Sequence, residues 1–458
     1  MNAWPRTSRD RRGRACVGWE LLLVLVALIT LSGCQGISAA SQQPPNTPPS
    51  GSTVLAMGSR PIQPGNWSFD CVYWNDGCGL NGSWITTNSQ PGTVRLWQSG
   101  TEWALLSTGN NSYDWKYLDT WVDLIAQRRP TVVMYTFGLV PCWISTAGCD
   151  SKGWGMGHNF SPGPPSDLTS NGSPAFDAFV TALVQHCSPA GHCVKDYIKY
   201  WEMWNEANLN GFWTGSATQL YEMFKPVIPI IRNNVPGAVI STPPVAGGDA
   251  AWMASWMDLE NTNGRLSDYY GIHIYMEQYA PEQRLGMLQN MLDTKNAKGW
   301  TATPWMNTET NYDHLTFTCS TLFTLEDCRG QFVRWHVLQY AYQGGGGGAF
   351  NVGWFKWESI ISGGYDTYYF TMMKWLSGAT FTASCTNTGT VWTCPLTEAN
   401  GTTALIVWNT AGGSEYTPAS EYVDYQFFNG TYGGATQSIS PGQSTAIGVV
   451  PIMFESGK

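Results

Sequence analysis

Two glutamates are the residues of this sequence whose type and position could do chemistry. Glu206 ends the segment 200–206 (YWEMWNE), and Glu309 lies in the segment 304–310 (PWMNTET). Both segments are apolar and strand-like, where a carboxylate is costly unless it has partners or a chemical task. Two such carboxylates can cleave a glycosidic bond, because one protonates the leaving oxygen while the other attacks or stabilises the anomeric carbon. The pair is therefore the candidate catalytic centre.

Three polar side chains are candidates for supporting these carboxylates. His273 and Tyr275 alternate onto one face of the predicted strand 269–275, and Arg95 lies in the predicted strand 93–98. A nucleophile must stay ionised, which requires a cation and hydrogen-bond donors. We expect Arg95 and the Tyr275 hydroxyl to supply these to one carboxylate, while apolar tryptophans keep the other protonated as the acid.

Alternation along the strand that delivers Glu206 places further side chains. It predicts Glu202, Trp204 and Glu206 on one face and Asn205 on the other. Glu202 then lies deeper than Glu206, where we expect it to balance a buried arginine.

The elements that position these residues alternate along the chain between strand-like and helix-like segments, which is typical of a parallel α/β fold. Seven strands are predicted at 93–98, 131–138, 198–206, 239–243, 269–275, 303–310 and 349–357, and an eighth must come from 54–74. Helices are predicted at 113–128, 176–186, 218–233, 281–295, 331–343 and 371–376. This repeat favours a closed (β/α)8 TIM barrel over residues 54–377 rather than an open doubly wound sheet.

The pattern changes after residue 377. Short alternating strands are predicted at 391–394, 404–408, 422–428 and 447–454, with no helix between them. We expect residues 378–458 to form a small antiparallel β-sandwich domain. It could be an independent carbohydrate-binding module, but we favour a domain packed against the barrel because no Pro- or Ser-rich linker separates the two.

The N-terminus has the features of an export signal. Arginines precede an apolar run at residues 21–31, which is too short to span a bilayer, and the sequence Leu31-Ser-Gly-Cys34 is typical of a bacterial lipobox. We predict a lipoprotein signal peptide at 1–34, a lipid anchor at Cys34 and a polar linker at 35–53. The protein would be exported and anchored to a bacterial membrane, the outer one in a Gram-negative cell, or to the cell surface. The alternative is an ordinary secretory signal that contains a cysteine.

Apart from Cys34 and Cys16, which lies in the predicted signal peptide, the cysteines fall into close pairs, and five local disulfides are the simplest proposal in an oxidising compartment. The pairs are Cys71–Cys78, Cys142–Cys149, Cys187–Cys193, Cys319–Cys328 and Cys385–Cys394. For one pair, zinc is an alternative, with His186, Cys187, His192 and Cys193 as ligands.

Composition limits the partners. Only 12% of residues are charged and the formal net charge is −9, so the chain lacks the basic surface that nucleic acid requires. Its 24 Trp and 21 Tyr favour surfaces that stack on sugar rings, although most aromatic residues are expected in the core. We expect a poly- or oligosaccharide substrate, no cofactor, no metal and a monomer.

The sequence resembles clan A of the retaining glycoside hydrolases, most closely the bacterial members of family 39. The similar segments are 94–103 (VRLWQSGTEW), 113–119 (YDWKYLD), 200–206 and 307–309 (NTE). The segment 136–143 departs from the clan because it lacks a histidine that several of its families have there, which leaves the sugar open.

The resemblance implies a role for each site residue. Glu206 would be the acid/base, Glu309 the nucleophile and Asn205 the donor to the sugar 2-hydroxyl. Arg95 and Tyr275 would hold the nucleophile, and His273 would line the subsite. Trp354 or Trp357 would form its floor, with Trp357 preferred.

These observations predict a retaining glycoside hydrolase that cleaves β-glycosidic bonds by double displacement, with its carboxyl groups roughly 5–5.5 Å apart. One alternative is a surface lipoprotein that binds glycans without cleaving them. Another is a transglycosylase with the same residues, in which a sugar replaces water as the acceptor. Fold alone decides none of these.

Overall fold

The computed structural model describes most of the chain after residue 92 and three residues before it. The described residues are 68–70, 93–97, 99–129, 132–149, 160–276, 279–310, 325–342, 351–353, 366–430 and 434–457. All of them belong to one compact unit, Pro45–Lys458. The predicted signal peptide, Cys34, the linker, Trp354 and Trp357 lie outside the described residues.

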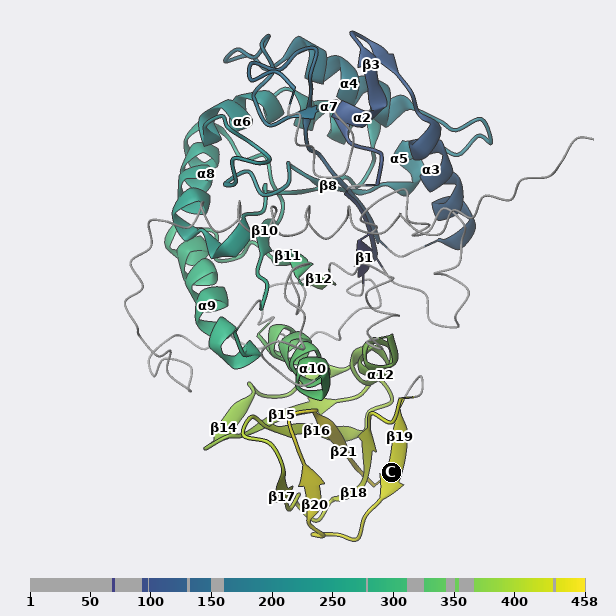
Figure 1. Cartoon of the computed structure of the whole chain (residues 1–458), viewed down its shortest axis with the longest axis vertical. Coiled ribbons are helices and arrows are strands. Elements are labelled where there is room, and N and C mark those ends of the chain that lie inside the picture. The colour runs from purple at the N-terminus through teal and green to yellow at the C-terminus, as the bar shows by residue number, and fades with distance from the viewer. Residues whose placement is uncertain are drawn as a thin grey trace, which may run out of the picture. The chain divides into compact units, whose positions relative to one another are not determined.

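Eight parallel strands form the α/β part of the molecule (Figure 1). A five-stranded sheet has the order β1 (Ser68–Asp70), β2 (Thr93–Leu96), β5 (Val132–Thr136), β8 (Tyr200–Glu202) and β9 (Val239–Ser241). A three-stranded sheet follows with β10 (Tyr270–His273), β11 (Trp305–Thr310) and β12 (Asn351–Gly353). A parallel bridge between Ser241 and Tyr269 links the two sheets, and β1 and β12 are in contact. All eight predicted strands are therefore present, including the one required from 54–74.

Helices follow the strands, as expected for an α/β fold. They are α2 (Trp103–Leu106), α3 (Lys116–Arg128), α4 (Pro174–Gln185), α5 (Val194–Tyr197), α6 (Ala217–Phe224), α7 (Val227–Asn234), α8 (Ala250–Asn263), α9 (Pro281–Ala297), α10 (Leu325–Ala341) and α12 (Asp366–Leu376). The helices α6, α8, α9, α10 and α12 contact one another in turn and lie outside the strands (Figure 1).

Local sequence explains where two of these helices begin. Ser173 accepts a hydrogen bond from the backbone of Phe176 at the start of α4, and Pro174 occupies its first turn. Ser216 and Gln219 form a capping box at the start of α6. The single helix predicted at 218–233 is wrong: α6 and α7 are separate helices because Pro226 has no backbone N–H to continue the ladder.

The core lies between the strands and the surrounding helices. Phe176 of α4 makes edge contacts with Phe137, which follows β5, and with Phe224 of α6, at centroid distances of 5.6 and 5.3 Å. All three side chains are buried, and each such burial stabilises the fold by about 1.5–3 kcal/mol. These contacts fix the end of β5 relative to α4 and α6.

The C-terminal part is an antiparallel sheet. Its strands are β13 (Thr380–Phe381), β14 (Thr386–Thr388), β15 (Val391–Thr397), β16 (Thr403–Asn409), β18 (Tyr422–Phe427), β19 (Ala435–Ser438) and β21 (Ile452–Ser456), and β17 (Ser414–Tyr416) pairs separately with β20 (Thr445–Ile447). The predicted antiparallel strands are confirmed, except that the strand 447–454 is divided between β20 and β21. Pro451, which cannot donate to a ladder, lies at this division.

A buried polar cluster joins this sheet to helices α9 and α10. The Trp408 indole donates to Glu282 Oε1 at 2.8 Å, and the same oxygen lies 3.0 Å from Arg334 Nε. Arg334 Nη1 donates to the Val449 carbonyl at 3.1 Å. A side chain at Gly330 would come within 2.5 Å of that carbonyl oxygen, so the close approach requires glycine.

Three of the five proposed disulfides are present: Cys142–Cys149, Cys187–Cys193 and Cys385–Cys394. Cys328 is also disulfide-bonded, whereas Cys71, Cys78 and Cys319 lie outside the described residues.

The zinc alternative is wrong for Cys187 and Cys193, because their disulfide leaves no thiolate to bind metal. The neighbouring His186 and His192 instead pair with Asp119 and Asp123 of α3 at 2.6 and 2.8 Å.

Among the described helices, none is both long enough and apolar enough to cross a bilayer.

Candidate active site

Glu206 is delivered by a turn and not by a continuous strand. Strand β8 ends at Glu202, and the backbone then enters the left-handed region at Trp204 (φ 75°) and Glu206 (φ 43°). This turn reverses the expected alternation. The Trp204 ring packs on Trp213 and Phe224, away from the site.

The prediction that Asn205 lies on the face opposite Glu202 is therefore wrong. Asn205 contacts the same arginine as Glu202, since the left-handed residue between them brings both side chains to one side. The predicted location of Trp204 on the inner face is wrong for the same reason.

Left-handed backbone at a residue other than glycine costs roughly 1–2 kcal/mol, so the turn must be held by its surroundings. The Trp204 indole donates to the Phe212 carbonyl at 3.0 Å, and the Leu209 amide donates to the Glu206 carbonyl at 2.9 Å. A small apolar cluster also packs the loops after β2, β5 and β8 together; it consists of Trp97, Ala104, Leu139, Phe160 and Phe212.

Arg95 is a buried cation at the centre of the site. Its Nη1 donates to Glu309 Oε2 at 2.7 Å, and its Nε and Nη2 donate to Glu202 Oε1 at 3.0 and 2.5 Å. Nη2 also donates to Asn205 Oδ1 at 2.8 Å, and the Thr136 hydroxyl donates to Glu202 Oε1 at 3.0 Å. The expected pairing of Glu202 with a buried arginine is confirmed.

Both carboxylate oxygens of Glu309 accept strong donors. Arg95 bonds to Oε2, and the Tyr275 hydroxyl donates a short hydrogen bond to Oε1. A cation and a hydroxyl donor both stabilise the ionised form of a carboxylate. Arg95 and Tyr275 are the two partners predicted for one carboxylate, and the structure brings them to Glu309.

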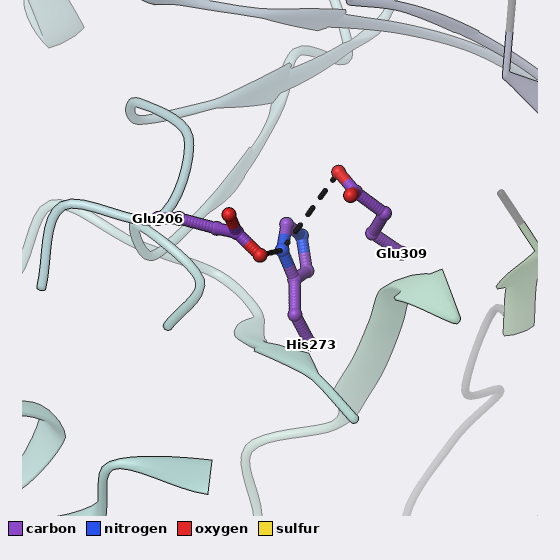
Figure 2. A group of neighbouring side chains, drawn as sticks. All are labelled: Glu206, His273 and Glu309. Carbon is purple, nitrogen blue, oxygen red and sulfur yellow. Dashed lines mark hydrogen bonds and ion pairs between the residues drawn. The ribbon is translucent and has the colours of Figure 1, made fainter. Parts of the chain in front are cut away.

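Glu206 faces a neutral imidazole. His273 Nδ1 lies 2.9 Å from Glu206 Oε1, and its Nε2 lies 3.1 Å from the Thr308 hydroxyl (Figure 2). Burial lowers the pKa of His273 to about 4, against an opposing contribution from Glu309. His273 therefore carries no charge at neutral pH, and the environments of Glu206 and Glu309 differ.

The two carboxylates are close to each other. One oxygen of each, together with a His273 ring nitrogen, lies within 4.8 Å of the others. In Figure 2 the imidazole lies between the two carboxylates. Retaining glycosidases have carboxyl groups about 5–5.5 Å apart and inverting enzymes about 6.5–9.5 Å. The spacing favours direct attack by a carboxylate rather than by a water held between the two.

The same three side chains have the donor atoms of a metal site, but their contacts are of another kind. Glu309 Oε2 already accepts from Arg95, whose guanidinium opposes a divalent cation at this point. The cluster is better suited to moving a proton and forming a bond to carbon.

The side-chain amide of Asn205 has one hydrogen-bonded end and one end without a partner among the described residues. Arg95 Nη2 can only donate, so the atom of Asn205 that faces it must be the amide oxygen. This fixes the amide orientation and leaves Nδ2 buried without a partner among the described residues. A buried amide without an acceptor is costly, and a ligand hydroxyl would satisfy it.

Most of the predicted site residues meet in one place. The structure brings together Glu206, Glu309, Arg95, Asn205, His273 and Tyr275. Trp354 and Trp357 lie outside the described residues, so the floor of the subsite stays a prediction.

Three contributors were missed by the sequence analysis. Thr308 bonds to His273, Thr136 bonds to Glu202, and the Asn208 side chain both donates to and accepts from the backbone of Ala246, at 3.1 and 2.9 Å. The hydroxyls gave no signal, because threonine is common in strands. Asn208 follows Glu206 by two residues, and its position so close to a catalytic candidate is the signal that could have identified it.

No protein-family model matches the chain, and no curated protein matches it significantly. Solved structures do. A family 39 β-xylosidase from Caulobacter crescentus is 13% identical with a TM-score of 0.59, and the alignment covers 88% of this chain and 99% of that one. A family 30 subfamily 8 xylanase from Clostridium acetobutylicum is 13% identical with a TM-score of 0.57, covering 87% and 97%.

A family 51 α-L-arabinofuranosidase from Bifidobacterium longum is 10% identical with a TM-score of 0.50, covering 88% and 98%. At these identities the comparisons establish the fold. The chain has the fold of clan A glycoside hydrolases, as its sequence resemblance predicted.

Proposed function

We propose that this protein is a retaining glycoside hydrolase that cleaves β-glycosidic bonds of a poly- or oligosaccharide by double displacement. The observation that carries the proposal is the asymmetry of two adjacent carboxylates. Glu309 is bonded to a guanidinium and a phenol, whereas Glu206 faces a neutral imidazole. One carboxylate is equipped to stay ionised and attack, and the other to carry a proton.

In the first step Glu309 attacks the anomeric carbon and forms an ester bond to the sugar. The glycosidic C–O bond breaks, and Glu206 gives its proton to the departing oxygen. Asn205 Nδ2, which is buried without a partner among the described residues, donates to the sugar hydroxyl next to the anomeric carbon and so helps to hold the ring in position.

In the second step water attacks the anomeric carbon and its proton passes to Glu206. The ester bond breaks, and Glu309 leaves as a carboxylate. His273 orients Glu206 throughout: with the proton on Nδ1 it donates to Oε1, and the Thr308 hydroxyl donates to Nε2.

The Arg95 guanidinium keeps a negatively charged partner throughout the reaction. When Glu309 becomes an ester it loses its negative charge, and a buried guanidinium without a counter-charge would be strongly destabilised. Glu202 remains bonded to Arg95 at 2.5 and 3.0 Å and neutralises it in both states. The deeper glutamate is thus part of the electrostatic design although it does not contact the sugar.

The finer features of the fold belong to the same proposal. Contact between β1 and β12 supports closure of the eight strands into a (β/α)8 barrel over residues 54–377. The pairing of β17 with β20, and the apolar cluster that includes Val407, Ile447 and Phe454, support a β-sandwich at 378–458.

The cellular setting is proposed from the sequence. A lipobox ending at Cys34 and several disulfides are consistent with export and a lipid anchor at the bacterial surface. Xylan is the first substrate to try, because two of the similar structures are named as a xylanase and a β-xylosidase.

The test is incubation with a panel of plant and microbial β-glycans, starting with xylan, in parallel with Glu309→Ala as the inactive control. We expect the wild type to release sugars whose first-formed anomer, read by NMR, has the β configuration of the substrate. An initial α product would contradict the retaining mechanism. Binding without cleavage by both proteins would instead indicate a glycan-binding lipoprotein, and longer products in the presence of acceptor sugars would indicate a transglycosylase.

A further inference from the structure

Exposed apolar side chains gather on the catalytic side of the α/β part. Among the residues that the structure describes, three large apolar side chains are exposed: Trp143 (43%), Tyr279 (41%) and Leu209 (39%). They follow β5, β10 and β8 respectively, so all three lie on loops at the C-terminal ends of parallel strands. Glu206 and Glu309 emerge at these same ends. Isolated exposed apolar residues are ordinary, but their restriction to one end of the strands is not.

Trp143 is held in a fixed orientation. Its indole nitrogen donates to the Ser107 hydroxyl at 3.0 Å, and its neighbour Cys142 is cross-linked to Cys149. Strand β6 (Val140–Pro141) lies just before it in the loop and pairs with β7 (Phe160–Ser161), which follows it. An exposed ring that is already immobilised loses little conformational entropy when a ligand stacks on it.

The Tyr279 ring is also held in place by its neighbours. The guanidinium of Arg284 lies 4.2 Å from the ring centroid. Arg284 Nε and the Tyr279 amide both donate to the Met276 carbonyl, at 3.2 and 3.0 Å. One face of the ring is therefore supported by a buried cation, and the side chain as a whole remains accessible.

Strand order places each of these two rings beside one of the catalytic carboxylates. Strand β5 pairs with β8, which leads to Glu206, and β10 pairs with β11, which carries Glu309. In the order of the strands, the loop with Trp143 therefore neighbours the one with Glu206, and the loop with Tyr279 lies between Glu206 and Glu309, next to Glu309. The apolar C–H faces of sugar rings stack well on flat aromatic side chains of this kind.

We propose that Trp143 and Tyr279 are stacking platforms for sugar units beyond the bond that is cleaved, so that the substrate is a glycan chain of several units. This inference rests on the proposed glycoside hydrolase activity. The sugar units that stack on Trp143 and Tyr279 then belong to the same carbohydrate chain that is cleaved at the catalytic centre.

The experiment compares kcat/KM along an oligosaccharide series, from the disaccharide to the hexasaccharide, of the glycan that the wild type hydrolyses. An aryl glycoside of the same sugar has a single sugar ring and serves as the control substrate. We expect Trp143→Ala to lower kcat/KM for the hexasaccharide about ten-fold, mainly through KM, and for the aryl glycoside less than about two-fold. Trp143→Phe, which keeps a stacking surface, should recover most of the loss, and Tyr279→Ala and Tyr279→Phe should behave in parallel.

The outcomes separate this inference from the proposed function. If the wild type cleaves glycans but kcat/KM does not depend on chain length, or if both alanine variants match the wild type on the hexasaccharide, the platforms are refuted while the activity stands. If the wild type cleaves nothing in the panel, both proposals fail. Should Trp143→Ala not fold, Tyr279→Ala and Ser107→Ala, which frees the Trp143 ring but retains it, provide the same comparison.

Discussion

Arg95 Nη1 lies 2.7 Å from Glu309 Oε2, and the guanidinium that makes this contact is also bonded to Glu202. Arg95 and Glu202 are fully buried, and the Glu309 side chain is nearly so. A buried cation between two carboxylates fixes the direction of the Glu309 side chain and stabilises its charge. The proposed nucleophile is thus oriented by the same group that supplies its counter-charge.

Replacing this cation should damage both stability and activity. Arg95→Met leaves Glu202 and Glu309 buried without their counter-charge, so we expect the free energy of unfolding to fall by about 3–5 kcal/mol and hydrolysis to be abolished. Arg232, in a half-exposed pair with Asp268 at 3.0 Å, is the matched control. Arg232→Met should cost less than about 1 kcal/mol and leave kcat unchanged. Equal losses in urea titrations of the two variants would refute the buried charge balance.

The Tyr275 hydroxyl should contribute to the rate more than to stability. Tyr275→Phe removes one donor to Glu309, and we expect kcat to fall about 100-fold with little change in KM. Tyr270, at the start of β10, the strand that precedes Tyr275, donates its hydroxyl to the Met291 carbonyl at 3.2 Å, away from the site. Tyr270→Phe should cost about 1 kcal/mol of stability and leave kcat intact. Steady-state kinetics that show the same kcat for both variants would contradict the role of Tyr275.

Glu206 should matter only where the leaving group needs a proton. Glu206→Gln cannot protonate the departing oxygen, so natural glycosides should lose at least about 1,000-fold in kcat/KM. A dinitrophenyl glycoside, whose leaving group departs as a stable anion, should lose much less in the bond-breaking step. Glu309→Gln should fail equally with both substrates because it lacks the nucleophile. Burst kinetics with the dinitrophenyl glycoside measure the bond-breaking step directly. If Glu206→Gln loses the same factor in kcat/KM with both substrates, Glu206 is not the acid and the assigned roles of the two glutamates are wrong.

Much of this site could be predicted because a buried charged side chain requires an oppositely charged partner. A glutamate in an apolar strand needs a cation, and this requirement correctly paired Glu202 with a buried arginine. The parallel repeat likewise required an eighth strand from a poorly patterned region, and β1 lies there.

The errors arose where local backbone overrides alternation. Nothing in the sequence around Trp204 indicates a left-handed residue, because glycine is the usual signal and tryptophan is not. The conformation depends on distant contacts, such as that between the Trp204 indole and Phe212. The break between α6 and α7 is different, since Pro226 was visible and its missing N–H could have been given more weight.

Two buried histidines should make stability depend on pH. Burial lowers the pKa of both His273 and His336 to about 4, from an ordinary value of 6.5. Because the folded pKa lies below the unfolded one, the unfolded chain binds protons first as pH falls. The stability from each neutral histidine is fully present above pH 6.5 and is lost as pH falls towards 4, at up to about 1.4 kcal/mol per pH unit.

His336 isolates this effect from catalysis, because it lies in α10 and donates from Nδ1 to the Phe332 carbonyl at 2.9 Å. Its replacement by Asn removes one titrating group, so the decrease in stability between pH 7 and pH 5 should be smaller in His336→Asn than in the wild type. Guanidinium titrations at pH 7 and pH 5 measure the free energy of unfolding of each protein. The contribution of the carboxylates is the same in both proteins and cancels when the two pH-dependent changes are subtracted. If the two proteins lose the same stability over this range, His336 titrates alike in the folded and unfolded states and the linkage is wrong.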